Sequence, residues 1–549
     1  MLRFLKDKDV RSRFNLLPVR VVWKSSSLED VDLEGLLANP QKHFSIKYDG
    51  DEPPSFVLDF GREIHGGIQL GQGMVKDKSP LPLKVVFGES VVEAMESPDQ
   101  DHAIHDTIIL LPWYGNNEVG TTGFRFVRIE MVKKNTEWLC TNIKAIVLIQ
   151  DLEYLGSFNS GDDLLNKIWE TGAYTAHLCL QDYLWDGIKR DRLVWIGDMH
   201  VETVVLSHLF GYNATIEKSL DFVRDNTPLP GWMNGISSYS LWWVIIQEYW
   251  YFMFSRRDYL KQQRDYLKGL VKQMLQCVNE SGKEVLPETR FLDWSTAENK
   301  DAIHSGLQSL LYWALTCAEN LLRELDELDL ANQCSKVREQ MKKYQPPEHL
   351  VKQSRALGVI AGLENPVKVN EECFKKDPLM GLSTFYGFYV LQARAMAGDR
   401  EGGLDLIRNY WGPMLKMGAT TFWEHFDIRW LEDSVPIDEV VPPGKKSIHR
   451  DFGEHCYVGL RHSLCHGWAA GPTAWLIQHV LGIQPIASSC KKIRIVPYLG
   501  NTLNFAEGTM PTPLGLVYVR HEKDKEGKTK TQFKAPKEIE VILAGNKEK

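Results

Sequence analysis

The sequence predicts a multidomain protein in which a large all-helical region lies between two β-rich regions. Three observations predict this. The first part of the chain alternates apolar and polar residues in short segments, the long middle part carries apolar residues at helical spacing, and the last part returns to alternation. Because 549 residues are too many for one compact core, we expect several domains, at residues 1–155, 156–484 and 485–549.

The N-terminal region is predicted to be an antiparallel β-sandwich. Gly, Pro, Asp and Asn separate its alternating segments, which is typical of a chain that turns back at the end of each strand. The expected strands lie at 56–60, 67–70, 83–87, 107–111, 126–131 and 143–149.

The middle region is predicted to be all-helical. Residues 162–184 place apolar side chains at helical spacing, and Asp162 or Asp163 can cap the start of this helix. Further helical stretches are expected at 198–225, 238–255, 257–279, 301–325, 327–344, 347–362, 382–398, 400–416 and 466–481. With segments that periodicity resolves poorly, about a dozen helices follow one another without strands between them, which suggests six stacked hairpins.

The C-terminal region is predicted to be a second, smaller β-domain. Alternation returns at 493–495, 515–520 and 539–543. The Lys-rich stretch 523–537 also contains Glu and Gly and precedes a final apolar strand, so we expect a solvated hairpin loop there.

Composition excludes several classes of partner. The chain has 64 basic and 72 acidic side chains, a net charge of −8, which argues against nucleic acid. It has no uninterrupted apolar run of about eighteen residues and no apolar segment at its start, so we expect neither a membrane span nor an export leader. Nine scattered cysteines without CxxC pairs predict neither a disulfide framework nor a zinc site, and indicate a cytoplasmic protein. A homo-oligomer is left open.

The densest chemistry lies in the stretch 185–198, which holds three carboxylates, two arginines and two tryptophans. Cleavage of a glycosidic bond needs one carboxyl group that stays protonated and another that stays ionised. Clustered acids separate one another's pKa values, arginines hold selected acids charged, and an indole face matches the apolar face of a pyranose. The alternative is a structural ion-pair network in which Arg190 and Arg192 neutralise Asp186, Asp191 and Asp198.

The string Asp-Gly-x-Lys-Arg-Asp-Arg-Leu-x-Trp-x-Gly-Asp, from Asp186 to Asp198, resembles the signature of the bacterial α-L-rhamnosidases. That family comprises inverting enzymes built on an (α/α)6 six-hairpin toroid. Other strings resemble the same family in chain order: its N-terminal β-sandwich at 59–63, 66–67, 87–90 and 123–127, its active-site segments at 418–424 and 464–472, and its small C-terminal β-sandwich domain at 495–497, 508 and 511–515.

The resemblance implies an exo-acting glycoside hydrolase that releases terminal α-L-rhamnose with inversion, using two carboxyl groups. Asp191 falls at the position of the general acid and Glu424 at that of the general base. Many family members have glutamate where this chain has Asp191, and the shorter side chain makes Asp198 the second choice for the proton donor. Glu424 could instead begin a helix after Thr420 and Thr421.

The expected substrate contacts combine charged residues of the motifs with aromatic ones. His466 could also be purely structural, and each tryptophan taken alone is more often a core residue. No metal triad and no phosphate-binding loop is apparent, so we expect no cofactor and no metal. The set is Asp186, Arg190, Trp195, Asp198, Trp242, Asp293, Trp294, Trp423 and His466.

Two other functions remain open at this point. The same fold could act on another α-L-sugar glycoside, such as an α-L-mannoside, which the unusual Asp191 motivates. Alternatively, the protein could bind carbohydrate without cleaving it, although a site freed from catalysis has no physical need of paired carboxylates. A phosphorylase is disfavoured because it would need a basic pocket for phosphate.

Overall fold

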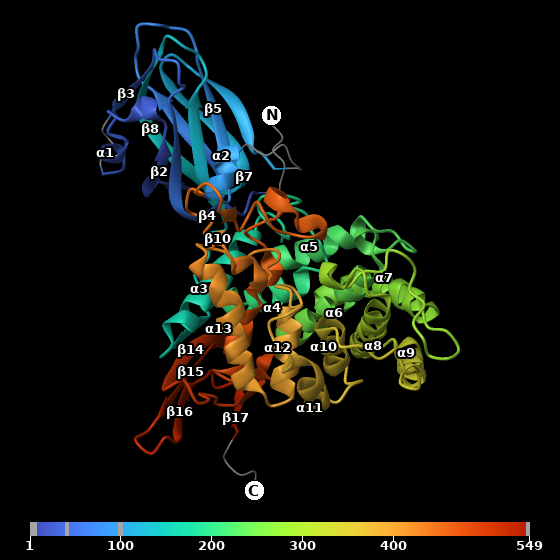
Figure 1. Ribbon diagram of the computed structural model, residues 1–549. Helices are drawn as coiled ribbons and strands as arrows, with labels where there is room; N and C mark the ends of the chain where they lie inside the picture. Colours follow the sequence, from blue (N-terminus) through green and yellow to red (C-terminus); the bar gives the residue numbers. More distant parts are fainter. Residues whose placement is uncertain (1–7, 39–42, 97–102, 545–549) are drawn as a thin grey trace.

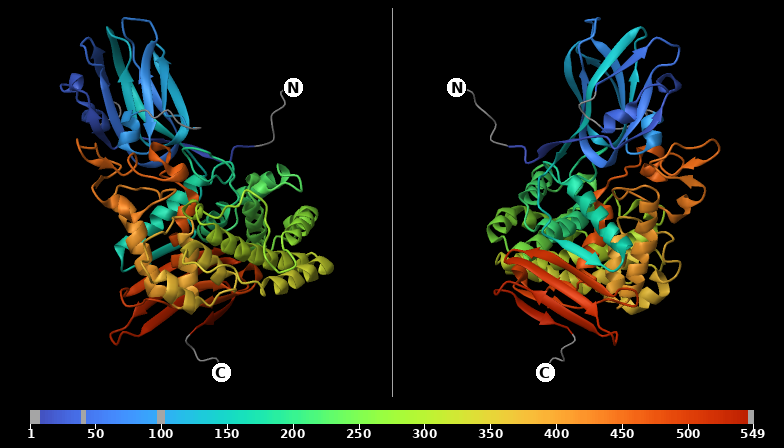
Figure 2. Two further views of the ribbon diagram at one scale, coloured as in Figure 1. Left: turned by 45° about the vertical axis from the view of Figure 1, so that its right-hand side comes forward. Right: turned by 90° about the vertical axis from the view of Figure 1, so that its left-hand side faces the viewer.

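The computed structural model describes residues 8–38, 43–96 and 103–544. It has strands at both ends of the molecule and helices between them, and the three views agree on this order (Figures 1 and 2). The predicted helical region between two β-rich regions is therefore confirmed.

The N-terminal strands form one antiparallel hydrogen-bonded network. Its order is β1-β8-β4-β7-β5-β6, with β2 paired to β4 and β3 paired to β8. Helix α1 (Leu33–Ala38) follows β2, and helix α2 (Val91–Glu96) follows β5 on the side that faces the helical region. The network encloses an apolar core of its own. The strands are β1 (Ser12–Leu16), β2 (Arg20–Lys24), β3 (Phe44–Tyr48), β4 (Ser55–Gln72), β5 (Leu81–Gly88), β6 (Asp106–Leu111), β7 (Gly115–Met131) and β8 (Thr136–Ile149).

The Gly66–Gly67 pair lies where three strands crowd together. A Cβ atom on Gly66 would lie 1.9 Å from the Ile146 carbonyl oxygen of β8, and one on Gly67 would lie 2.3 Å from the Val119 oxygen of β7. The register between β4 and β7 also shifts at this pair. The two glycines therefore permit a close strand approach, not a nucleotide site.

Twelve helices, α3 to α14, fill the described middle region. Helices α4, α6, α8, α10, α12 and α14 contact one another in that order, and α14 contacts α4, so this set closes on itself. Every residue of α4 is buried. The helices are α3 (Asp163–Cys179), α4 (Met199–Phe210), α5 (Ala214–Asp225), α6 (Ser237–Phe254), α7 (Arg257–Gln276), α8 (Lys300–Glu324), α9 (Leu328–Met341), α10 (Lys352–Ile360), α11 (Pro366–Val369), α12 (Gly387–Met396), α13 (Arg400–Lys416) and α14 (Gly471–His479).

One predicted helical stretch, 198–225, is divided in two. Gly211 ends α4 with a positive φ of 71°. Two residues later Asn213 begins α5, because its side chain accepts a hydrogen bond from the Thr215 amide at 2.8 Å. Helical spacing continues across this turn, so periodicity alone missed it.

The C-terminal strands form two small sheets. One has the order β16-β15-β14-β9 and the other β12-β13-β17. Strand β9 precedes α3 in the chain, so one strand of the last sheet comes from the sequence before the helical region. Its core is also continuous with that of the helices. The strands are β9 (Ser157–Ser160), β12 (Ile483–Pro485), β13 (Lys492–Ile495), β14 (Phe505–Thr512), β15 (Gly515–Lys523), β16 (Thr529–Lys534) and β17 (Glu540–Leu543), with the separate pair β10 (Ser434–Val435) and β11 (Lys446–Ser447).

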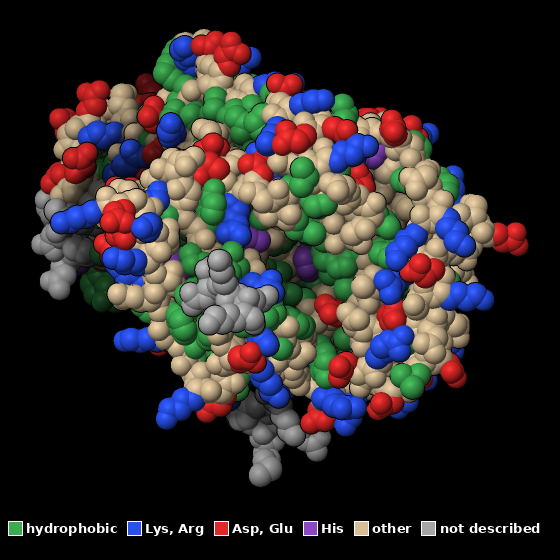
Figure 3. Space-filling view, turned by 90° about the horizontal axis from the view of Figure 1, so that it is seen from below, with side chains coloured by type: hydrophobic (Ala, Val, Ile, Leu, Met, Phe, Trp, Pro, Cys, Tyr) green, Lys and Arg blue, Asp and Glu red, His purple; other side chains and the backbone are tan. Residues whose placement is uncertain are grey.

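The face seen in Figure 3 intersperses acidic and basic side chains without a large region of one sign. None of the described helices is both long and apolar enough to cross a membrane. All nine cysteines carry free thiols, and only Cys456 is not fully buried.

Candidate active site

The loop between α3 and α4 presents Asp191 at its tip. The Asp186 amide donates to the Leu193 carbonyl at 3.1 Å, and the Leu193 amide donates to the Asp186 carboxylate at 2.9 Å, which closes the loop. Asp191 and Arg192 both have a φ of 52°, a conformation that is costly for residues other than glycine. The indole N–H of Trp195 donates to Asp191 at 3.2 Å, and Arg192 donates to the Thr121 carbonyl at 2.8 Å. Two successive residues with positive φ thus form the tip of the loop.

Glu424 lies in the segment that follows α13 and is 4% exposed. Arg190 donates to both of its carboxylate oxygens, at 2.6 and 2.5 Å, and the Ser463 amide donates to one of them at 3.2 Å. Burial acts to raise the pKa of Glu424, but the charges of Arg190 and His466, together with hydrogen bonds from Ser463 and Arg190, lower it by more, so the net shift is downward. Glu424 is therefore held ionised.

The alternative that Glu424 begins a helix is wrong. The next helical turn starts only at Ile428. The Thr420 hydroxyl accepts from the Glu63 amide at 2.8 Å, and the Thr421 hydroxyl donates to the Leu464 carbonyl at 2.7 Å. Both threonines hold neighbouring segments instead of capping a helix.

Arg190 joins the two carboxylates that the sequence singles out. One of its nitrogens lies 3.3 Å from Asp191, while another bonds Glu424. Its Nε donates to the Arg461 carbonyl at 2.8 Å, which fixes the guanidinium from a third side. Asp191 and Glu424 are thus separated by two ion-pair contacts and the width of one guanidinium.

Asp198 and His466 form a second buried pair next to this group. The His466 Nε2 lies 2.9 Å from the Asp198 carboxylate. Burial and the charges of Glu424 and Asp191 raise the pKa of Asp198, His466 lowers it, and the net shift is upward. Burial lowers the pKa of His466, but Glu424 and Asp198 outweigh it, so the net shift is upward. Among the described residues, nothing bonds the His466 Nδ1, which is a buried nitrogen without a partner.

The segments that carry Glu424 and His466 run beside each other and beside the loop. The Glu424 amide donates to the Ser463 carbonyl at 3.0 Å, and the His466 amide donates to the Phe422 carbonyl at 3.0 Å. The Gly467 amide donates to the Asp186 carbonyl at 2.8 Å. Asp186 itself is buried, and this burial raises its pKa well above the usual aspartate range.

Asp293 and three of the four predicted tryptophans border the same group. Asp293 accepts hydrogen bonds from Ser295 and Ser383 at 2.8 and 2.5 Å, and the adjacent Thr384 donates to the Glu424 carbonyl at 2.6 Å. Trp294 is half-buried, with its ring 6.4 Å from that of Tyr457. Trp195 contacts Asp191 as described above. Trp423, directly before Glu424, is buried, and its indole N–H has no partner among the described residues.

The fourth, Trp242, lies apart from the charged residues. It is 1% exposed on α6. Its ring packs against His200 at 5.2 Å, Tyr389 at 5.2 Å and Trp313 at 5.6 Å. This aromatic core offers a sugar no open face.

Several site residues were not predicted from the sequence. Trp468 lies within the 464–472 string but was given no role there. Its indole N–H donates to the Glu424 carbonyl at 2.8 Å. Glu202, on α4, is fully buried, and neither of its carboxylate oxygens has a partner among the described residues. Burial raises the pKa of Glu202 well above the usual range. Glu202 is a single acid within an apolar helix and belongs to no motif, so the sequence gave no reason to place it in the site.

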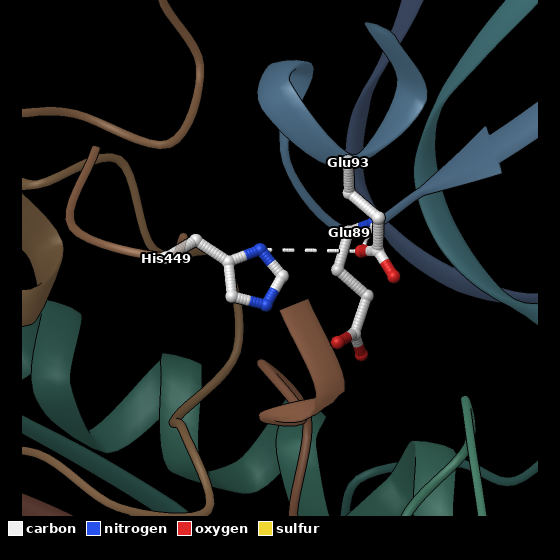
Figure 4. Close-up of side chains that lie close together, drawn as sticks. All are labelled: Glu89, Glu93 and His449. Carbon is white, nitrogen blue, oxygen red and sulfur yellow. Dashed lines mark hydrogen bonds and ion pairs between the residues drawn. The ribbon is translucent and has the colours of Figure 1, made fainter. Parts of the chain in front are cut away.

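One group of side chains has the composition of a metal site. Ligand atoms of Glu89, Glu93 and His449 lie within 4.8 Å of one another (Figure 4). However, the Lys189 ammonium lies 3.0 Å from Glu89 and 3.1 Å from Glu93. The chain thus supplies its own cation to these carboxylates, and the donor set does not favour a metal ion.

Residues 153–353 match the family model described as the bacterial alpha-L-rhamnosidase 6 hairpin glycosidase domain. The chain resembles the bacterial α-L-rhamnosidases, as the sequence strings predict. An α-L-rhamnosidase from Alteromonas sp. (strain LOR) is 24% identical over 600 aligned residues, which cover 94% of this chain and 61% of that protein.

Solved rhamnosidase structures share the fold. The GH78 family rhamnosidase of Bacillus sp. GL1 superposes with a TM-score of 0.75 at 20% identity, over 91% of this chain and 54% of that one. A rhamnosidase from Klebsiella oxytoca with rhamnose bound has a TM-score of 0.66 at 21% identity, over 85% and 95% of the two chains. The chain therefore spans little more than half the length of the Alteromonas and Bacillus rhamnosidases.

Proposed function

We propose that this protein is an exo-acting glycoside hydrolase that releases terminal α-L-rhamnose with inversion. One observation carries the proposal: Arg190 contacts both Asp191 and Glu424, so two carboxyl groups far apart in sequence meet in one site. The resemblance to rhamnosidases supports the choice of sugar.

Glu424 has the properties of the general base. Its lowered pKa keeps it ionised, and an ionised carboxylate can take a proton from water. Inverting enzymes place acid and base roughly 6.5–9.5 Å apart to leave room for that water. A guanidinium between two carboxylates is compatible with such a separation.

Asp191 and Asp198 are both candidates for the proton donor. Asp191 lies at the loop tip with 23% of its side chain exposed, where it can reach a leaving-group oxygen. Asp198 is buried, and its raised pKa favours the protonated form that a donor needs. We retain Asp191 as the first choice because it shares Arg190 with the base.

The remaining predicted residues would hold the sugar. The unpartnered His466 Nδ1 and Trp423 indole N–H are suited to bond hydroxyl groups, while Trp195 and Trp294 offer indole faces. Asp186 closes the loop through its carboxylate, so we propose that it acts through Asp191 and not directly. Trp242 would contribute only packing.

We also propose that the helices form an (α/α)6 toroid flanked by β-sandwiches, with domains at 1–155, 156–484 and 485–549. The closed set of contacts among α4, α6, α8, α10, α12 and α14 supports the toroid. The free thiols support a reducing compartment such as the cytoplasm.

The proposal is tested with an aryl α-L-rhamnoside and the variant Glu424→Gln. We expect the wild type to release β-L-rhamnose first, seen by NMR before mutarotation. We expect Glu424→Gln to lose turnover by at least about 100-fold while binding rhamnose in calorimetry. Release of the α-anomer would contradict inversion, and retained steady-state turnover would move the base elsewhere.

A panel of aryl glycosides addresses the other sugars. The shorter Asp191 motivates an α-L-mannoside or another deoxy-sugar as a second candidate. Faster turnover of such a substrate would redirect the assignment, and sugar binding without release of any aglycone would indicate a non-catalytic binding protein.

A further inference from the structure

A buried cluster of charged and titratable residues joins the N-terminal strands to the active-site loop. We call Glu89, Glu93, Lys189, His105 and His449 the interface cluster. Glu89 follows β5 and Glu93 lies on α2, whereas Lys189 lies directly before Arg190 in the loop. Both carboxylates are fully buried and Lys189 is 2% exposed. Figure 4 shows the two glutamates, with His449 approaching from the opposite segment.

Every member of the interface cluster has a hydrogen-bond or ion-pair partner. Besides the two glutamates, the Lys189 ammonium donates to the carbonyls of Leu460 at 2.9 Å and His462 at 2.8 Å. His105 lies 3.2 Å from Glu93. Burial acts to raise the pKa of Glu93, but Lys189 and His105 lower it to about 2. Buried ion pairs are weak contributors to net stability because their desolvation is costly. A positional role accounts better for this arrangement.

Hydrogen bonds connect Glu89 to Glu424 through two consecutive residues. The Leu464 amide donates to the Glu89 carboxylate at 2.7 Å, and the Ser463 hydroxyl lies 3.4 Å from its other oxygen. The Ser463 amide in turn donates to Glu424 at 3.2 Å, while the Glu424 amide donates to the Ser463 carbonyl at 3.0 Å. Fixing residues 463 and 464 therefore fixes the carboxylate of Glu424.

Lys189 provides a second route. It is adjacent in the chain to Arg190, which bonds both oxygens of Glu424 and contacts Asp191. Glu89 therefore holds the base from one side through Ser463 and from the other through Lys189 and Arg190.

We propose that Glu89, a residue of the N-terminal β-region, is a positioning residue for Glu424, acting through Leu464–Ser463 and through Lys189–Arg190. The inference rests on the proposed function where it treats Glu424 as the base. It makes the N-terminal region part of the catalytic unit and not an appended binding module.

The position of Glu424 has a measurable signature in the pH profile. The Ser463 amide and Arg190 are among the groups that lower the pKa of Glu424. Loosening either contact raises that pKa, so the acidic limb of kcat/KM moves to higher pH. The charged and titratable groups around Glu424 include Arg190, Asp191, Asp198, His425, Cys456, Tyr457 and His466.

The test compares Glu89→Ala and Glu89→Gln with Asp59→Asn. Asp59 is also a buried carboxylate at this interface, but its partners are Arg125 and Arg20, and it does not contact residues 463–464. We expect Glu89→Ala to lower kcat at least about tenfold with a smaller change in KM. Glu89→Gln keeps one acceptor oxygen and should give an intermediate loss. Both should move the acidic limb upward by at least about 0.5 pH unit.

Hydrogen–deuterium exchange provides a readout that needs no substrate. The amides of Ser463 and Leu464 should exchange faster in both Glu89 variants but not in Asp59→Asn. If Glu89→Ala does not fold, Glu89→Gln carries the comparison. Unchanged exchange and an unchanged acidic limb in Glu89→Gln would overturn the proposal and leave the cluster a structural contact. Absence of glycosidase activity in the wild type would refute the proposed function, and exchange would still decide the positioning link.

Discussion

Asp191 combines features that a passive ion-pair partner would not need. Its positive φ is maintained by the loop closure through Asp186 and by the hydrogen bond from Trp195. Asp198, by contrast, is buried at the start of α4, where its carboxylate bonds His466. Strain of this kind persists where the surrounding structure over-determines it, commonly at active sites. The two aspartates therefore differ in exposure and partner, and a substitution can tell them apart.

The proton donor is identified by its dependence on the leaving group. We expect Asp191→Asn to lower kcat about 100-fold or more on a rhamnoside with a sugar or alkyl leaving group. The loss should be much smaller with a nitrophenyl leaving group, which departs without a proton. Asp198→Asn should lower both rates alike, because it disturbs His466. Steady-state kinetics on both substrates check this, and the reversed pattern would assign the donor role to Asp198.

At the scale of elements, strand β7 supports the loop directly. Gly123 of β7 lies so close to the loop that a Cβ atom there would be 2.7 Å from the Lys189 amide nitrogen and 2.8 Å from the Ile188 carbonyl carbon. Backbone atoms at these distances cannot move aside as a flexible side chain can. The string 123–127, quoted only for its resemblance, therefore includes a glycine with a steric function.

Gly123→Ala should displace the loop that carries Arg190 and Asp191. We expect a destabilisation of about 1–3 kcal/mol from overpacking and at least about a tenfold loss of kcat, since small displacements of catalytic groups are costly. Thermal unfolding and aryl-rhamnoside kinetics measure the two effects. Gly50→Ala is the control, because nothing lies within 4 Å of its added Cβ atom. A lower Tm with unchanged kcat would show that the loop does not depend on this contact.

Elements with local periodicity could be predicted from the sequence, whereas contacts between them could not. The expected strands at 56–60 and 126–131 fall within β4 and β7 because alternation is a local pattern. The meeting of Asp191 with Glu424 was predicted through the family strings. Glu89 lay in a quoted string but received no role, since its partners Lys189 and Leu464 are remote in sequence.

At the scale of the whole molecule, three of the contacts between the N-terminal region and the helical region end close to the active site. Arg125 donates to Asp59 at 2.8 Å and to the Gly418 carbonyl at 2.8 Å. The Glu63 amide donates to Thr420, and Glu89 accepts from Leu464. All three contacts end on segments that lead into Glu424 or His466. Acid conditions that discharge Asp59 should therefore weaken the attachment of the N-terminal region to the helices.

Asp59→Asn should destabilise the protein in a pH-dependent way. Burial acts to raise the pKa of Asp59, but Arg125 and Arg20 lower it by more, so the folded pKa lies below the ordinary value. A carboxylate with a lowered pKa stabilises the fold above its unfolded pKa of about 3.9, and this stabilisation is lost as the pH falls through the folded value. We expect a loss of about 3 kcal/mol at pH 7, the lower end for a broken buried pair because Arg20 is 45% exposed. Thermal unfolding of wild type and variant should show their Tm values converging below about pH 4. A Tm difference that stays constant from pH 7 to about pH 3 would mean that Asp59 acts through shape and hydrogen bonding instead of charge.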